Sequence, residues 1–416
     1  MSEFPPLYRA APSQDTAATG QVPAFSSPLE VLLIFLRLGC TSFGGPIAHL
    51  GYFRAEFVER RKWLTERAYV DLVALSQFLP GPASSQTGFG IGLMRGGLLG
   101  GLAAWTGFTM PSAIMMVLFA FGAGTIADSH VGAGVLHGLK LVAVAIVAQA
   151  VMGLSRSLCP DRARASIAMI ALIVMLVAPW SVLQIGTIVV GGIAGWMLCR
   201  GQADTTPDNI TMPVSRKLGI VCLTAFFVVL AVACVPTQSG ALALFNAFYR
   251  SGALVFGGGH VVLPLLRNAV VVPGWVSDST FLAGYGAAQA VPGPLFTFAA
   301  YLGAVADVLP GGVAGAFIAL IAVFAPGILC FLGVLPFWND LRAKPGAQAA
   351  MRGTNAAVVG LLGAALYNPV WTSAVQSPGD CAVAATGFIL LIVWNAPPLL
   401  VVALSALVGA GLSLID

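Results

Sequence analysis

The sequence predicts an all-α polytopic membrane protein whose two homologous halves form an inverted-topology repeat with broken or re-entrant helices. Three observations predict this fold class: an apolar composition, a set of motifs that occurs twice in one order, and a charge bias that differs between the two sets. Of the 416 residues, 58% are hydrophobic and 9% are charged, whereas a soluble domain carries about 25% charged residues. Lipid must therefore be the main solvent of the chain, as the mean hydropathy of +0.91 also indicates.

Apolar stretches divide the chain into four parts. Residues 1–27 are rich in Pro, Ser, Thr and Ala without an apolar run, so we expect a flexible cytoplasmic tail. Residues 28–199 form the first half, residues 200–239 hold a polar linker and an extra apolar segment, and residues 240–416 form the second half. Several stretches approach the roughly 20 residues that a spanning helix needs, and none alternates like a barrel strand. The stretches are 29–50, 68–93, 98–121, 133–152, 167–178, 182–199, 218–236, 241–263, 281–304, 312–335, 349–367, 382–393 and 397–413.

The motifs of the first half recur in the second half in the same order. The repeated pairs are Arg37-Leu38-Gly39 with Arg250-Ser251-Gly252, Phe43-Gly44-Gly45 with Phe256-Gly257-Gly258, Gln77-x-x-Pro80-Gly81-Pro82 with Gln289-x-x-Pro292-Gly293-Pro294, Gly96-Gly97 with Gly311-Gly312, Pro111 with Pro326, and Gly138 with Gly353. Chance similarity between apolar segments would not keep these motifs in register, so the chain contains an internal repeat.

Lys and Arg residues indicate opposite orientations for the two halves, because they concentrate in cytoplasmic loops. The loop at 52–67 is strongly basic, whereas its counterpart at 264–280 holds only Arg267. The loop at 153–166 is likewise more basic than 368–381, and the bias reverses between 122–132 and 337–348. The extra apolar segment at 218–236 adds the crossing that would invert the second half.

One topology satisfies these charges if the first two apolar stretches of each half are re-entrant hairpins. They would break at Phe-Gly-Gly and at Pro-Gly-Pro, and the other four stretches would span the bilayer. The alternative makes every stretch a full crossing, which conflicts with positive charge at either 52–67 or 122–152. We prefer the hairpins, and the number of full crossings stays open.

The Pro-Gly-Pro motifs predict an anion site. Proline suits the first turn of a helix, and glycine lets the backbone approach a ligand closely. Helices that begin after Pro82 and Pro294 would offer free N–H groups and a partial positive charge, as at the midplane sites of inverted-repeat transporters. A simple helix kink is the alternative. The predicted substrate-binding residues are Arg37, Gly44, Gly45, Pro46, Gln77, Pro80, Gly81, Pro82, Arg250, Gly257, Gly258, Gln289, Pro292, Gly293 and Pro294.

Charged residues within the apolar stretches are further candidates. Arg37 and Arg250 are matched in the repeat, and an intramembrane Arg costs roughly 2.5–3.5 kcal/mol on insertion scales. No acidic residue recurs beside them, and a guanidinium grips an oxyanion with two donors. Snorkelling to the membrane interface is the alternative. Candidates for a proton or anion relay are His49, Asp71, Lys140 and His260, although a lone His is more often a packing residue.

Catalytic and metal-binding motifs are missing from the sequence. There is no Walker A motif, no H-E-x-x-H, no Cys/His metal spacing and no nucleophile elbow. We therefore expect no enzyme activity, no cofactor, no metal and no nucleic-acid partner.

The Phe-Gly-Gly-Pro turn at 43–46, the duplicated Gln-x-x-Pro-Gly-Pro motif and the duplicated halves resemble the chromate ion transporter family in its long two-domain bacterial form. The resemblance runs from about residue 28 to the end, with one departure: Gly259 stands where the first half has Pro46. It implies a multi-pass protein of the bacterial inner membrane that exports chromate, with sulfate as a chemical analogue, and so gives chromate resistance. The residues alone imply only an anion.

Several alternatives stay open. The membrane potential, a proton gradient or both could drive transport. An uptake or exchange carrier for sulfate or a related oxyanion is the first rival function, and a membrane-embedded enzyme or scaffold is the second. Assembly as a homo-oligomer is also open.

Overall fold

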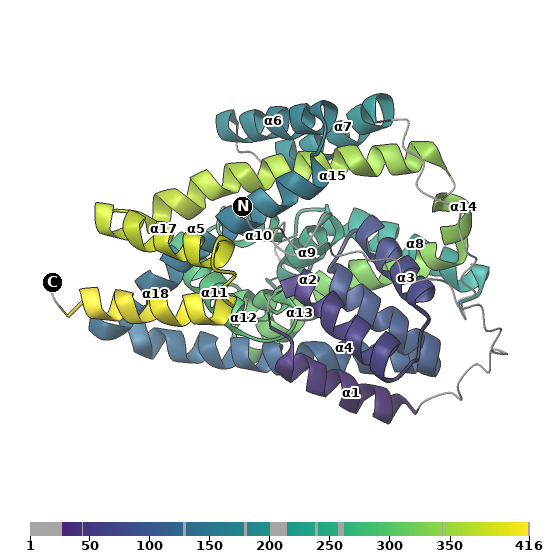
Figure 1. Cartoon of the computed structure of the whole chain (residues 1–416), viewed down its shortest axis with the longest axis horizontal. Coiled ribbons are helices and arrows are strands. Elements are labelled where there is room, and N and C mark those ends of the chain that lie inside the picture. The colour runs from purple at the N-terminus through teal and green to yellow at the C-terminus, as the bar shows by residue number, and fades with distance from the viewer. Residues whose placement is uncertain are drawn as a thin grey trace, which may run out of the picture.

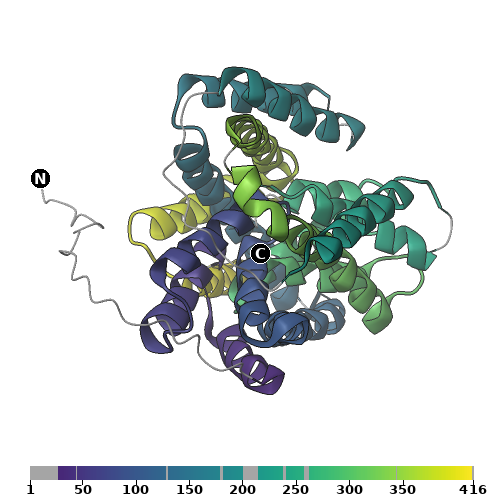
Figure 2. The ribbon, with the colours of Figure 1, turned by 90° about the vertical axis from the view of Figure 1, so that its right-hand side faces the viewer.

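The computed structural model describes residues 27–43, 45–127, 130–178, 181–199, 214–237, 240–256, 262–342 and 344–414. In these ranges the chain forms helices and no strand, which confirms the all-α class (Figures 1 and 2). The first half contains α1 (Pro28–Thr41), α2 (Gly45–Arg54), the π-helical turn η1 (Ala55–Arg60), α3 (Glu66–Phe78), α4 (Ala83–Ala127), α5 (His130–Leu158), α6 (Arg162–Val177) and α7 (Ser181–Leu198).

The helix α8 (Arg216–Ala233) separates the two halves. The second half contains α9 (Gly240–Ala253), α10 (Val262–Val270), α11 (Asp278–Ala290), η3 (Leu295–Thr297), α12 (Phe298–Val305), α13 (Gly312–Val334), η4 (Leu335–Phe337), α14 (Trp338–Arg342), α15 (Pro345–Ala365), η5 (Leu366–Trp371), α16 (Thr372–Ala374), α17 (Pro378–Ile392) and α18 (Pro398–Leu412).

The first two apolar stretches are broken where the motifs predict. α1 and α2 have 14 and 10 residues, which gives about 21 and 15 Å at 1.5 Å per residue. Neither helix alone crosses a hydrocarbon core of about 30 Å. α3 ends at Phe78, and α4 begins directly after Pro82. Gly96 and Gly97 interrupt α4 again with non-helical backbone angles.

Five helices in the described ranges are long and apolar enough to cross a membrane. They begin at Ala83, Val131, Arg216, Gly312 and Pro345. Large apolar side chains stay exposed along α6, α7 and α8, such as Ile170, Val190 and Phe227. Such surfaces are stable in lipid, so these findings confirm a multi-pass membrane protein.

Matched glycines show that the two halves share one packing pattern. A Cβ added to Gly39 on α1 would lie 2.7 Å from the carbonyl oxygen of Gly107 on α4. A Cβ added to Gly252 on α9 would lie 2.1 Å from the carbonyl oxygen of Val323 on α13. α1 therefore packs on α4 as α9 packs on α13.

The halves also exchange their last two helices. α6 and α7 pack along α15 of the second half, and α17 and α18 pack along α5 of the first half (Figure 1). The contacts are close because glycines meet backbone: a Cβ on Gly353 would lie 2.1 Å from the oxygen of Gly191, and one on Gly138 would lie 2.1 Å from that of Ser405. Reciprocal contacts of this kind are those that a two-fold axis produces.

Helix directions show that the two halves are inverted. α15 is antiparallel to α7, because Gly195 contacts Ala349 while Gly191 contacts Ala357. α5 is likewise antiparallel to α18, because Gly134 contacts Gly409 while Gly138 contacts Ser405, and Figure 1 shows α5 and α15 crossing the molecule in opposite directions. α15 is the repeat counterpart of α5, so the two halves run in opposite directions.

Candidate functional site

The first Pro-Gly-Pro break lies buried between the two halves. The backbone N–H of Gly81 donates to the carbonyl oxygen of Val255, 2.8 Å away. Gly81 has φ +119°, and a Cβ there would lie 2.9 Å from the Cα of Gly327 on α13. Only glycine fits this position, because both the backbone angle and the close approach exclude a side chain.

The second break repeats these contacts with the roles of the halves exchanged. The N–H of Gly293 (φ +98°) donates to the carbonyl oxygen of Ser42, 2.9 Å away. A Cβ on Gly293 would lie 2.8 Å from Oγ of Ser112 on α4. Ser42 and Val255 each precede a Phe-Gly-Gly motif, so each Pro-Gly-Pro of one half contacts the Phe-Gly-Gly segment of the other.

A helix begins at each break. Gln86 N–H donates to the carbonyl of Pro82 at 3.0 Å, so the first turn of α4 starts directly after the motif. The preceding amides have no acceptor further back in the helix, as at every helix N-terminus. After Pro294 the chain makes the short 3-10 turn η3 before α12, and the hydroxyl of Thr297 donates to the carbonyl of Pro294 at 2.8 Å.

Gln86 links the first Pro-Gly-Pro break to the second half through side-chain hydrogen bonds. It was not among the predicted site residues. Its Nε2 donates to the carbonyl of Pro80 at 2.8 Å and to that of Gly327 at 2.9 Å. The available signal was the polar run Ser84-Ser85-Gln86-Thr87 inside an otherwise apolar stretch.

Among the relay candidates that the structure describes, His49 lies at a break. It is 1% exposed on α2, and its Nδ1 lies 3.4 Å from Oγ of Ser84 in the first turn of α4. The edge of its ring meets Phe108, with ring centroids 5.2 Å apart. Its Nε2 is buried and has no hydrogen-bond partner within the described ranges.

The remaining neutral and relay candidates lie further along the helices. Gln77 is exposed near the end of α3, and Asp71 is half-buried about two turns before the break. Gln289 is half-buried, and its Nε2 has no partner among the described residues. Lys140 is half-buried on α5 without a hydrogen bond or ion pair in the described part of the chain.

The Phe-Gly-Gly motifs are described only in part. Gly45 has φ +77° and begins α2 together with Pro46. The predicted site residues Gly44, Gly257, Gly258 and His260 lie outside the described residues.

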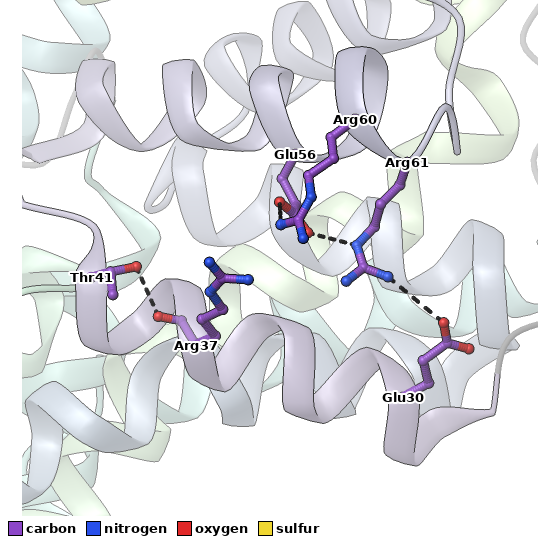
Figure 3. Close-up of polar contacts among 6 residues, drawn as sticks. All are labelled: Glu30, Arg37, Thr41, Glu56, Arg60 and Arg61. Carbon is purple, nitrogen blue, oxygen red and sulfur yellow. Dashed lines mark hydrogen bonds and ion pairs between the residues drawn. The ribbon is translucent and has the colours of Figure 1, made fainter.

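Arg37 lies beside a cluster of charges at the basic loop. Figure 3 shows its side chain directed from α1 toward η1, where Glu56 accepts hydrogen bonds from Arg60 and Arg61. Arg61 also lies 3.8 Å from Glu30. The Arg37 guanidinium forms no ion pair with a described residue, and Arg250, half-buried on α9, forms none there either. We call Glu30, Arg37, Glu56, Arg60 and Arg61 the basic cluster.

The basic cluster carries more positive than negative charge. Burial of the Glu56 carboxyl opposes ionisation, but hydrogen bonds from Arg61 and Arg60 outweigh it and hold the pKa of Glu56 below its ordinary value. The carboxylate is therefore ionised at neutral pH and neutralises only part of the three guanidinium charges. Such a surface attracts anions.

Two inverted helical halves, with broken helices that meet at a buried boundary, define a membrane transporter of the inverted-repeat class. The chromate transporter family model matches residues 29–196 and 242–410, and the chain belongs to that family. The chromate transport protein of Pseudomonas aeruginosa is 28% identical over 93% of this chain and 92% of its own length. The chromate transport protein of Cupriavidus metallidurans is 25% identical over 95% and 96% of the two chains. No solved structure matches the chain.

Proposed function

We propose that this chain is a secondary transporter that exports chromate from the cytoplasm across a bacterial inner membrane and thereby confers chromate resistance. The observation that carries the proposal is the pair of reciprocal contacts, Gly81 with Val255 and Gly293 with Ser42. These contacts place the start of α4 at the boundary between the halves, where inverted-repeat transporters bind substrate. The printed names of the relatives support chromate as the substrate.

The proposed anion site combines the two breaks with the matched arginines. Its residues are Arg37, Gly44, Gly45, Pro46, Gln77, Pro80, Gly81, Pro82, Arg250, Gly257, Gly258, Gln289, Pro292, Gly293 and Pro294. Backbone amides at the helix start would bind the oxyanion, since they carry partial positive charge without the hydration of a full cation. Arg37 and Arg250 would add positive charge along the approach to the breaks.

Alternating access would follow from rocking one half against the other. In each state a different side of the boundary opens, while the site itself stays at mid-membrane depth. The contacts between the halves that would have to change include the backbone hydrogen bonds of Gly81 and Gly293, the side-chain hydrogen bond from Gln86 to Gly327, and the contact of His137 with Asp380.

The membrane potential is sufficient to drive export of a dianion. A potential of 100 mV acts on each elementary charge with about 2.3 kcal/mol. Chromate carries two negative charges, so it gains roughly 4.6 kcal/mol per 100 mV on leaving a negative interior. Proton coupling through His49, Asp71 or His260 would add to this force.

Everted membrane vesicles test the proposal. We expect uptake of labelled chromate into everted vesicles that contain the protein, with a rate that rises with an imposed interior-positive potential. A proton gradient varied at fixed potential separates the two driving forces. Sulfate movement only in the opposite direction would establish an uptake carrier instead, and no flux of either anion in proteoliposomes would establish a non-transporting protein.

A further inference from the structure

The buried polar side chains at the breaks come mainly from the first half. Two residues after Pro-Gly-Pro, the first half has Ser84 and the second half has Phe296. Directly before Phe-Gly-Gly, the first half has Ser42 and the second half has Val255. Two residues before the matched prolines Pro111 and Pro326, the first half has Thr109 and the second half has Phe324. All six residues are buried. The repeat therefore keeps its backbone pattern in both halves but keeps hydroxyl groups at these positions only in the first.

Packed aromatic rings close the helix start of the second half. Phe296 lies against Phe324 with ring centroids 5.7 Å apart, and Phe298 lies against Phe281 at 5.1 Å. The nearby hydroxyl of Thr297 already donates to the carbonyl of Pro294. A ligand at this helix start would have to displace rings that are at most 1% exposed.

Five buried polar groups around the start of α4 have no hydrogen-bond partner within the described ranges: Gln86 Oε1, Thr87 Oγ1 and the three groups that follow. Ser42 Oγ, His49 Nε2 and Ser85 Oγ make no hydrogen bond within the described ranges, and each residue is at most 3% exposed. An unpaired buried donor costs about 1–3 kcal/mol, and native structures leave few of them without reason. Grouped in one region, the hydroxyl and imidazole groups can donate hydrogen bonds to a ligand or to water.

These groups belong to one connected region. His49 contacts Ser84, which directly precedes Ser85. The His49 ring packs on Phe108, whose carbonyl oxygen lies 3.2 Å from a Cβ placed on Gly293. Gly293 in turn donates to Ser42. The region therefore extends from the start of α4 to the second break.

We infer that the transported oxyanion binds on the first-half side of the boundary, held by the neutral donors His49, Ser42, Ser85 and the first-turn amides of α4. The second half supplies an apolar wall formed by Val255 and Phe296. The inference rests on the proposed function and narrows its site to one half. Neutral donors suit a fully ionised tetrahedral dianion that must also leave, because a contacting guanidinium would hold it more strongly.

Matched hydroxyl substitutions in the two halves test the inference. Ser85→Ala and His49→Phe each remove one donor, and Thr297→Val removes the hydroxyl at the position matched to Ser85. We expect each first-half variant to raise the KM of chromate flux in everted vesicles about tenfold, which corresponds to about 1.4 kcal/mol. Thr297→Val should leave the KM unchanged. His49→Gln, which keeps an N–H donor, should retain more affinity than His49→Phe.

A direct measurement of chromate binding distinguishes an error in the proposed binding site from an error in the proposed transport function. Calorimetric titration of the purified full-length protein with chromate should show the same order of affinities. A Thr297→Val effect as large as that of Ser85→Ala, or unchanged affinity in both first-half variants, would overturn the inference. Binding without flux would overturn the transport proposal alone, and no binding to the wild-type protein would overturn the site as well. Ser85→Thr, which keeps the hydroxyl, checks that a loss is not due to misfolding.

Discussion

At the scale of single residues, Gly293 joins the two halves through its backbone. Gly293→Ala would force a Cβ to within 2.8 Å of Ser112 Oγ and 3.2 Å of the Phe108 carbonyl oxygen, at φ +98°. We expect a loss of about 1–3 kcal/mol of stability from the backbone strain, with a further loss from the clash. Thermal unfolding of the purified protein, together with vesicle flux, measures both effects.

Gly274→Ala is the matched control for this substitution. Gly274 also has a positive φ, +82°, but a Cβ there would have no heavy atom within 4 Å. The control should therefore lose less stability and keep its flux. Equal losses of stability and flux from Gly293→Ala and Gly274→Ala would show that the contact between the halves contributes nothing to either property.

Features that depend on neighbouring residues in the sequence were predictable, whereas contacts between distant segments were not. The break at Gly81 was predictable, because Pro-Gly-Pro interrupts a helix in any context. The carbonyl partner of Gly81, Val255, was not predictable, because a contact between segments far apart in the chain leaves no local pattern. The contacts of Gln86 were not predictable from the Pro-Gly-Pro motif, which ends at Pro82, because they reach a carbonyl group far away in the chain.

At the scale of helical elements, η1 is tied to α1 through the basic cluster. Glu56→Gln should destabilise this end of the protein, by up to about 1 kcal/mol for a partly exposed group. The pKa of Glu56 lies below its ordinary value of 4.5. Its pairing therefore stabilises the folded state above that pH and is lost as the pH falls through the lowered pKa. The wild-type advantage in unfolding temperature should thus be constant above about pH 5 and shrink below pH 4.5.

Glu59→Gln provides the control within the same turn. Glu59 pairs with Arg54, and both side chains are about half exposed. Solvent screening leaves such a pair little net stability, so this variant should resemble the wild type at every pH. A larger loss from Glu59→Gln than from Glu56→Gln would contradict the assigned importance of the Glu56 contacts.

At the scale of the whole molecule, the inverted arrangement predicts that 52–67 and 264–280 lie on opposite sides of the membrane. In a chain without native cysteines, Arg60→Cys and Val272→Cys are both exposed positions. We expect an impermeant thiol reagent to label Val272→Cys from outside intact cells, and Arg60→Cys only in everted vesicles. Labelling of both positions from one side would contradict the inversion.

The inversion itself was predictable, whereas the way in which the halves interlock was not. Lys and Arg counts in matched loops determine orientation without any knowledge of packing. The pairing of α7 with α15 and of α18 with α5 depends on complementary glycine surfaces such as those at Gly353 and Gly191. Small residues occur throughout this chain, so their presence alone does not identify the partner helix.

The exchange of terminal helices also has a consequence for biosynthesis. The face of α5 that receives α18 is complete only when residues 398–412 have entered the membrane. The first half is therefore inserted before its packing is complete, and α5 has no partner on this face until the second half has been translated. A nonsense codon before residue 398 would then destabilise α5 as well, although α5 is translated long before α18.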